Sequence, residues 1–269
     1  MIYIILALLL LSILYILSTY CRRPRQGMAA FRGWVYAHRG LHGNGVPENS
    51  LDAFRRARDA GYGSELDVHL LADGNLAVIH DHKLDRTTGV TGVIEDLTAK
   101  ELKNYKLQGT DETIPLFSDV LNLYSGAAPL IVELKATSKN VAKLCETACK
   151  VLDQYEGIYC VESFDPRCIH WLRKNRPDII RGQLTENYFA SKTSKLPWIL
   201  KLILRHQILN FLTRPDFIAY RYSDRRTISN FLCRKLWGAQ GVTWTLTSKE
   251  QFDTAMAENW IPIFEGFLP

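Results

Sequence analysis

The chain has 269 residues, of which 47% are hydrophobic and 23% charged, a composition that suits one large α/β domain or two small ones. Its formal net charge of +5 is mild, and no basic stripe with interleaved aromatic residues runs through its centre. These features argue against a nucleic-acid-binding protein, and they favour anionic small molecules or membrane surfaces as partners.

The first twenty residues contain a long uncharged segment. Residues 2–19 are almost wholly apolar and long enough to span a hydrocarbon core as a helix. A secretory signal peptide should begin with a positive region and end at a small-x-small cleavage site, and this segment has neither. We therefore predict an uncleaved transmembrane anchor over residues 1–20 and a basic juxtamembrane linker over residues 21–33.

The flanking charges predict the orientation of this anchor. Arg22, Arg23 and Arg25 follow the apolar run, and no lysine or arginine precedes it. By the positive-inside rule, we expect a single-pass protein of the cell membrane with residues 34–269 on the cytoplasmic side.

From residue 34 onward, short β-like runs alternate with helical ones. The expected strands are WVYAHRG, GSELDVHLL, NLAVIHD, PLIVELK, IYCVESF, RGQLTE, DFIAYRYS and GVTWTLTS, and the segment WIPIFEG follows the last expected helix. The expected helices cover residues 50–60, 98–105, 117–124, 140–155, 166–175, 229–238 and 248–258. This alternation predicts a parallel sheet with helices outside it, and both an open doubly wound sheet and a closed (β/α)8 barrel fit. No glycine-rich nucleotide-binding motif follows the first strand, which removes the main reason to prefer the open sheet.

Candidate catalytic residues concentrate between His38 and His82, a window that holds five of the seven histidines. Alternate side chains of a strand share one face, so Glu65 and Asp67 point the same way. Two carboxylates this close repel each other unless a cation lies between them, and Mg²⁺ or Ca²⁺ is the natural guest. The alternative is the solvated face of an edge strand.

The same pattern recurs in PLIVELK, where Glu133 and Lys135 share one face of an otherwise apolar strand. An unpaired glutamate is costly to bury there. A third carboxylate for the same metal explains it, with Lys135 able to neutralise a phosphate. A simple Glu–Lys pair at the end of the strand is the alternative.

His38 and His80 end the first and third expected strands. Histidine is suited to exchanging protons near neutral pH, and the carboxyl ends of barrel strands are where catalytic groups cluster. We therefore predict a general base and a general acid on either side of the metal. Arg39, next to His38, can bind a phosphate through its planar guanidinium.

Taken in order, these motifs resemble the glycerophosphodiester phosphodiesterase family. The match comprises HRG at 38–40, PEN at 47–49, ExD at 65–67, His-Asp at 80–81, ExK at 133–135, SF at 163–164 and WT at 244–245. It runs from about residue 36 to residue 269. The resemblance implies a TIM barrel over residues 34–269 and one divalent cation, Mg²⁺ or Ca²⁺.

The resemblance also implies roles for individual residues. Glu65, Asp67 and Glu133 would be metal ligands, and His38 and His80 the general base and acid. Glu48 would be a further ligand or a carboxylate behind the ligands. The phosphate and substrate would be bound by Arg39, Asn49, Lys135 and Trp244.

The activity implied is metal-dependent hydrolysis of glycerophosphodiesters to sn-glycerol 3-phosphate and an alcohol, in glycerophospholipid metabolism. Two alternatives stay open: a lysophospholipase D that acts on lysophospholipids at the membrane, and a non-catalytic membrane-tethered barrel. Two features depart from the family: residues 189–211 are unusually apolar and basic, and the family usually ends its barrel with Thr-Asp before a proline. Here residues 264–269 read FEGFLP.

Residues 195–214 mix apolar and basic side chains and contain no acidic residue. The segment is too charged to span a bilayer, but such a helix can lie in the interface of an anionic membrane. An ordinary barrel helix packed on its strands is the alternative. The membrane hypothesis predicts that Trp198, Leu202 and Leu209 are exposed on the same side as His38 and His80.

Overall fold

The computed structural model describes residues 1–23, 26–190 and 195–269. Within these ranges the strands are β1 Tyr36–His38, β2 Gly63–Leu70, β3 Leu76–Val78, β4 Leu130–Leu134, β5 Tyr159–Ser163, β6 Arg181–Thr185, β7 Phe217–Arg221, β8 Gln240–Leu246 and β9 Trp260–Phe264. The α-helices are α1 Ile2–Ser18, α2 Leu51–Asp59, α3 Asp85–Thr88, α4 Phe117–Tyr124, α5 Val141–Leu152, α6 Pro166–Asn175, α7 Trp198–Arg205, α8 Asn210–Thr213, α9 Ile228–Phe231 and α10 Lys249–Ala257.

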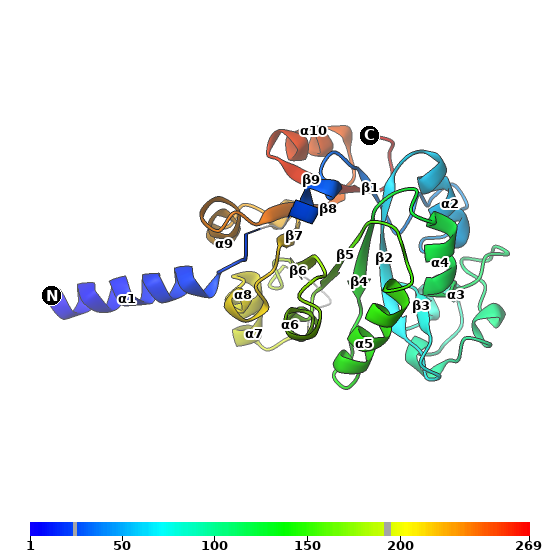
Figure 1. Ribbon diagram of the computed structural model, residues 1–269, viewed down its shortest axis with the longest axis horizontal. Helices are drawn as coiled ribbons and strands as arrows, with labels where there is room; N and C mark the ends of the chain where they lie inside the picture. The colour runs from blue at the N-terminus through cyan, green and yellow to red at the C-terminus, as the bar shows by residue number, and fades with distance from the viewer. Residues whose placement is uncertain (24–25, 191–194) are drawn as a thin grey trace.

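All the strands except β3 close into a parallel barrel with helices around it (Figure 1). Closure is made by β1, in which Tyr36 lies opposite both Gly63 of β2 and Ile263 of β9. The sheet is therefore a (β/α)8 barrel, and the open doubly wound alternative is wrong. Each expected strand overlaps an observed one, so the fold prediction is confirmed for the barrel.

The alternation of β2 explains how its side chains divide between two environments. Leu66 and Val68 face outward into a buried apolar cluster with the helices, including Leu144 of α5. Burying such a side chain stabilises the fold by about 1.5–3 kcal/mol. Glu65 and Asp67 therefore face the barrel interior. Nearer the amino ends of the strands, the interior is filled by apolar residues such as Phe217 and Ile261.

Residues 21–33, expected as a linker, contribute to the packing of the barrel. Cys21, Met28 and Phe31 are each about 1% exposed, and Met28 and Phe31 belong to the cluster that fills the barrel interior. Arg22 also forms an ion pair with Asp216, at the start of β7. Residues 24–25, and with them the predicted orienting charge of Arg25, lie outside the described residues.

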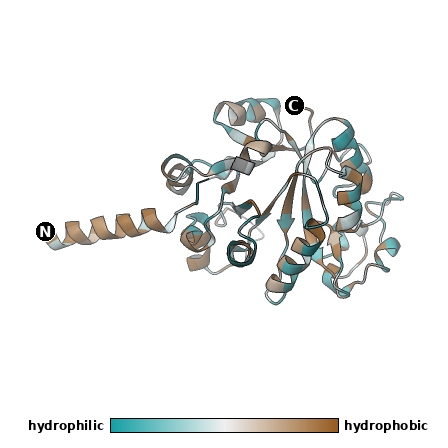
Figure 2. Ribbon diagram, in the orientation of Figure 1, coloured by the Kyte–Doolittle hydropathy of each residue, from teal (hydrophilic) through white to brown (hydrophobic). Residues whose placement is uncertain are grey.

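The segment predicted as a transmembrane anchor forms a helix in the structure. Helix α1 has 17 residues, which at 1.5 Å per residue is about 26 Å. None of the helices in the described ranges has the length and apolar character needed to cross a membrane. Figures 1 and 2 show α1 as an apolar helix that projects away from the barrel, and none of its residues is buried.

The segment 195–214 contains helices α7 and α8. Trp198 is 65% exposed and Leu202 is 37% exposed, as the membrane hypothesis predicts. Leu209 is half-buried instead, because the chain turns between the two helices at that point. Helix α7 therefore has an apolar side that does not pack on the barrel.

Candidate active site

Three buried carboxylates converge inside the barrel mouth. Glu65 and Asp67 come from β2 and Glu133 from β4, and the register places Asp67 beside Glu133. None is more than 6% exposed, and one oxygen from each lies within 4.8 Å of the others. The shared strand face predicted this convergence.

The charges around this carboxylate cluster fit a divalent cation. Burial and the neighbouring carboxylates raise the pKa of Glu65 well above its usual range, and burial raises the pKa of Glu133 to about 7. The amine of Lys135 contacts Asp67 at 2.9 Å and Glu133 at 2.8 Å, and it does not contact Glu65. The cluster thus has more negative charge than its neighbours neutralise, and its all-oxygen donors are those that Mg²⁺ and Ca²⁺ prefer.

A tight turn after β1 brings Arg39 to the cluster. Arg39 and Gly40 both have positive φ, and a side chain on Gly40 would meet the backbone of Ala53 at 2.8 Å, so only glycine fits. The Arg39 guanidinium lies 3.4 Å from Asp67 and donates a hydrogen bond to Glu48 at 2.9 Å. This arrangement places a fixed positive charge beside the carboxylates.

Asn49 and Glu48 lie at the start of α2, which is capped by the hydroxyl of Ser50. Asn49 donates to Asp67 at 2.9 Å, and its buried Oδ1 has no hydrogen-bond partner in the described chain. Both oxygens of Glu48 bond to arginines, Arg39 and Arg86, and Glu48 is outside the converging carboxylate cluster. Of the two roles predicted for Glu48, the structure is compatible with a carboxylate that holds neighbouring residues in place and does not itself bind the metal.

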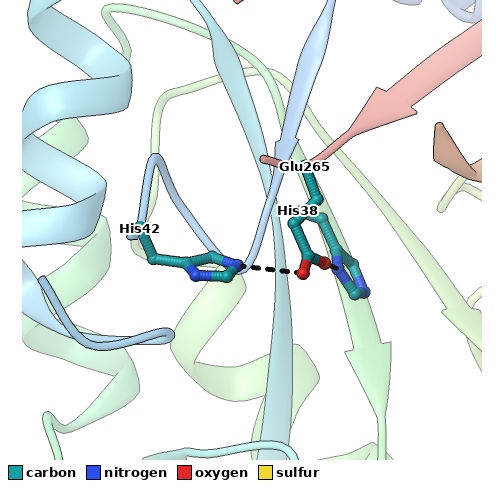
Figure 3. A group of neighbouring side chains, drawn as sticks. All are labelled: His38, His42 and Glu265. Atoms are coloured by element: carbon teal, nitrogen blue, oxygen red, sulfur yellow. Dashed lines mark hydrogen bonds and ion pairs between the residues drawn. The ribbon is translucent and has the colours of Figure 1, made fainter. Parts of the chain in front are cut away.

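His38 lies at the carboxyl end of β1 with its two ring nitrogens in different surroundings (Figure 3). Nδ1 is 2.5 Å from Glu265, and Nε2 is 3.9 Å from Glu65. Burial lowers the pKa of His38, although Glu265 partly offsets this by raising it. The Glu265 contact favours the tautomer with the proton on Nδ1, which leaves Nε2 free to accept a proton.

His80 approaches the same mouth from the opposite side, by a different route from the predicted one. It follows β3, which runs antiparallel to β2 and is not a barrel strand, so His80 does not end a barrel strand. Because β3 runs back along β2, it returns the chain to the mouth, where Ile79 donates to the carbonyl of Asp67. Nδ1 of His80 is 2.6 Å from Asp81, and Arg86 contacts both Asp81 and Glu48.

Trp244, predicted to bind substrate, lies on β8. Its ring packs edge-on against Phe164 with centroids 5.6 Å apart, and its buried Nε1 has no hydrogen-bond partner within the described ranges. A cleft of about 460 Å³ lies next to the carboxyl ends of β4 and β5, lined by His80, Glu133, Lys135 and Phe164 among others. The predicted histidine and lysine therefore border a space open to a substrate.

The sequence analysis missed two carboxylates in this site. Glu162 of β5 is 1% exposed and lies opposite Glu133 in the register, and one of its oxygens lacks a partner among the described residues. Glu265 follows β9 and contacts His38. Glu162 lies on the strand expected at IYCVESF, where an inward-facing acid was the available signal, and Glu265 lies in WIPIFEG, directly after β9.

Comparison with known proteins agrees with this geometry. Residues 38–218 match the model of the glycerophosphoryl diester phosphodiesterase family. A glycerophosphodiester phosphodiesterase of Bacillus altitudinis is 43% identical over 163 residues, which cover 56% of this chain and 66% of that protein. Human glycerophosphodiester phosphodiesterase 1 is 25% identical over 280 residues, covering 89% of this chain and 78% of the relative. The chain thus spans slightly less than two thirds of the length of the Bacillus altitudinis relative.

Solved structures share the fold. A phosphodiesterase of Oleispira antarctica, in complex with the product sn-glycerol 3-phosphate, superposes with a TM-score of 0.72 at 22% identity, covering 88% of this chain and 94% of the other. A glycerophosphodiester phosphodiesterase of Thermotoga maritima gives a TM-score of 0.65 at 24% identity, covering 87% and 95%. The family model matches more than half of the chain, and the ordered motifs meet in one barrel mouth. The chain therefore belongs to the glycerophosphoryl diester phosphodiesterase family.

Proposed function

We propose that the protein hydrolyses glycerophosphodiesters to sn-glycerol 3-phosphate and an alcohol, as part of glycerophospholipid metabolism. One observation carries the proposal: two histidines, each bonded to a carboxylate through Nδ1, flank three converging buried carboxylates. Family membership supports the same reaction. A non-catalytic barrel would have no use for this costly arrangement, because buried charges destabilise a fold unless they are well paired.

Glu65, Asp67 and Glu133 would hold one divalent cation, Mg²⁺ or Ca²⁺. When bound, the ion would supply positive charge for the phosphate oxygens as negative charge develops on them. Arg39 and Lys135 border the same space and would orient the phosphate. Trp244 and Phe164 would pack against the rest of the substrate.

His38 and His80 would move the protons. In one route, Nε2 of His38 takes the proton of the glycerol 2-hydroxyl, whose oxygen attacks phosphorus, and His80 protonates the alcohol as its bond to phosphorus breaks. Water then opens the cyclic phosphate. In the other route, His38 takes a proton from water, which attacks phosphorus directly. Phosphorus-31 NMR during turnover distinguishes the routes, because the cyclic glycerophosphate is observable in the first.

The test is hydrolysis of a panel of glycerophosphodiesters, with sn-glycerol 3-phosphate measured by a coupled dehydrogenase. We expect turnover that EDTA abolishes and that Mg²⁺ or Ca²⁺ restores. Glu65→Gln should be inactive, whereas Glu101→Gln, at an exposed position outside the site, should match the wild type. Turnover unaffected by both EDTA and Glu65→Gln would exclude the proposed metal site.

A second candidate substrate is a lysophospholipid at a membrane surface. The observation that favours it is the apolar side of α7, where Trp198 and Ile199 are 65% and 53% exposed in a segment that follows the carboxyl end of β6. A helix of this kind can lie in an anionic interface close to the barrel mouth. Release of choline from lysophosphatidylcholine in anionic vesicles, compared with glycerophosphocholine in solution, tests this candidate. Lack of any release from the lysolipid would leave the soluble diesters as the substrates.

A further inference from the structure

A second group of potential metal ligands lies beside the carboxylate cluster, on the Nδ1 side of His38 (Figure 3). It consists of His38 at the end of β1, His42 in the loop that follows, and Glu265 just after β9. One ligand atom from each residue lies within 4.8 Å of the other two. Three separate segments therefore bring two imidazoles and one carboxylate to a common point.

Glu265 lies between the two rings, and Figure 3 shows a nitrogen of each ring directed toward it. One carboxylate oxygen is 2.5 Å from Nδ1 of His38, and the other is 3.8 Å from Nε2 of His42. At that distance the His42 nitrogen makes an ion-pair contact but no hydrogen bond, and it is buried without a hydrogen-bond partner among the described residues. A buried polar atom in that state costs free energy, which a bound ligand would recover.

We propose that His38, His42 and Glu265 form a second metal site, which takes Zn²⁺ or a similar transition-metal ion and thereby inhibits the enzyme. The inference rests on the proposed function, because it uses His38 as the general base. Two imidazole nitrogens and a carboxylate suit Zn²⁺, whereas the all-oxygen cluster of Glu65, Asp67 and Glu133 suits Mg²⁺ or Ca²⁺. The two sites should therefore select different ions.

The geometry requires only small movements. Zn²⁺ binds nitrogen and oxygen ligands at about 2.0–2.2 Å, so neighbouring ligand atoms in a tetrahedral site are about 3.3 Å apart. One ligand atom from each residue already lies within 4.8 Å of the other two, so bringing each pair to that separation takes a movement of at most about 1.5 Å. His42 lies in the loop after β1, which can supply most of this movement.

Inhibition follows from the chemistry of the imidazole ring. A neutral ring has one N–H, which on His38 faces Glu265 through Nδ1. Zn²⁺ bound at Nδ1 replaces that proton, and the neutral ring then has its proton on Nε2. Nε2 is the atom that would accept the substrate proton, so the zinc-bound ring cannot act as the base.

The first experiment measures zinc binding without any reaction. The full-length protein is titrated with Zn²⁺ in millimolar Mg²⁺, which keeps the carboxylate cluster filled, with a chromogenic chelator as competitor. We expect one zinc site per chain. His42→Ala and His42→Gln should bind zinc at least tenfold more weakly, because removing a residue that only supports a metal ligand already lowers affinity about 10–100-fold. His170→Ala, a histidine on α6, is the matched control.

The second experiment measures zinc inhibition of glycerophosphocholine hydrolysis. His42→Ala should keep the zinc-free rate and lose most of the sensitivity to Zn²⁺, while His170→Ala stays sensitive. Equal binding or equal inhibition of wild type and His42→Ala would overturn the second site, and so would inhibition that additional Mg²⁺ relieves. If zinc binding depends on His42 but no glycerophosphodiester is hydrolysed, the metal site stands and the proposed function fails.

Discussion

The two halves of the barrel mouth differ in what their inward-facing side chains can do. On β1, β2 and β4 these are His38, Glu65, Asp67 and Glu133, all ionisable and held by close contacts. On β6, β7 and β8 the interior is lined by apolar residues such as Leu184, Ala219 and Val242. The proposed proton and metal chemistry would therefore lie in the first half, and the second half, in which Arg221 of β7 lies beside Trp244, would shape what enters.

The outer surfaces follow the same division. Helices α7 and α9, which follow β6 and β7, leave large apolar side chains in solvent, including Trp198 at 65% and Ile228 at 70% exposure. On the opposite side, α2 and α4 bury Phe54, Phe117 and Val120 in the main core. A contiguous apolar patch on a surface often marks a binding site, and four neighbouring exposed residues of α7, Trp198, Ile199, Leu200 and Leu202, are candidates for one. The comparison predicts that substitutions in the first half stop catalysis and that those in the second change substrate access.

The largest effect should come from Asp67→Asn. Asp67 is contacted by Lys135, Arg39 and Asn49, and it also belongs to the proposed metal cluster. We expect kcat/KM to fall about a thousandfold, because losing the ion removes several kcal/mol of charge stabilisation. Metal content, measured on the dialysed protein, should fall with it.

The matched control is Asp224→Asn in the second half, where the carboxylate accepts a hydrogen bond from the backbone of Asn187. That variant should keep its metal and most of its turnover. Comparable losses in the two variants would mean that catalysis is not confined to the first half.

Next in size are His38→Ala and His80→Ala. Each should lower kcat at least about a hundredfold with the fold intact, as expected when a general acid or base is lost. Circular dichroism and thermal unfolding check the fold, and His170→Ala on α6 provides a histidine outside the site. A variant with near-normal turnover would remove that histidine from the mechanism.

The sequence was most informative where local rules decide the structure. Strand alternation was enough to put Glu65 and Asp67 on one face, and it put Glu133 on the matching face of another strand. The β-then-α order restricted the topology to two parallel-sheet folds, and the pairing of β1 with both β2 and β9 decided between them. That pairing depends on shear and tilt around the whole sheet, which no single segment encodes.

The features missed by sequence analysis are contacts between distant segments. Glu265 meets His38 across 227 residues, and Arg86 joins Glu48 to the neighbour of His80. Only barrel closure brings the end of β9 beside β1. The end of the first helix was also not predictable, since hydropathy measured over residues 2–19 does not say where the helix ends. In the structure it ends at Ser18, because Thr19 packs against Trp237 and Cys233.

A smaller effect, with a definite sign, is expected for Glu265→Gln. Burial lowers the pKa of His38, and the carboxylate of Glu265 raises it in part. On the acid side of the pH profile, kcat/KM of the wild type should therefore fall with a midpoint below the ordinary histidine pKa of about 6.5. This decline is the acid limb of the profile. Without the carboxylate the pKa of His38 falls further, so the limb should move to lower pH while the plateau rate falls about tenfold.

The pH profile distinguishes two explanations for a slower Glu265→Gln variant. The profile shifts if Glu265 acts on His38, and it stays in place if the substitution only damages the site. Glu112→Gln, in which the altered carboxylate accepts a hydrogen bond from the backbone of Asp52, changes an acid outside the mouth and should leave the profile unchanged. An acid limb that stays in place in Glu265→Gln, or that moves to higher pH, would show that Glu265 does not act on His38.

The smallest effect on soluble substrates should come from the double variant Trp198→Ser, Leu202→Ser. Both side chains are exposed on α7 and contribute little to the core, so turnover of glycerophosphocholine should stay within about twofold of the wild type. If the apolar side of α7 meets lipid, turnover of lysophosphatidylcholine in anionic vesicles should fall several-fold, because the lost apolar area weakens interfacial binding. Ile158→Ser, Met256→Ser is the matched control, since those residues are 43% and 42% exposed and precede β5 and β9, at the other end of the barrel. If both double variants lose the same fraction of turnover on vesicles, the effect comes from general surface hydrophobicity. If neither loses turnover, the second half of the mouth has no role in lipid access.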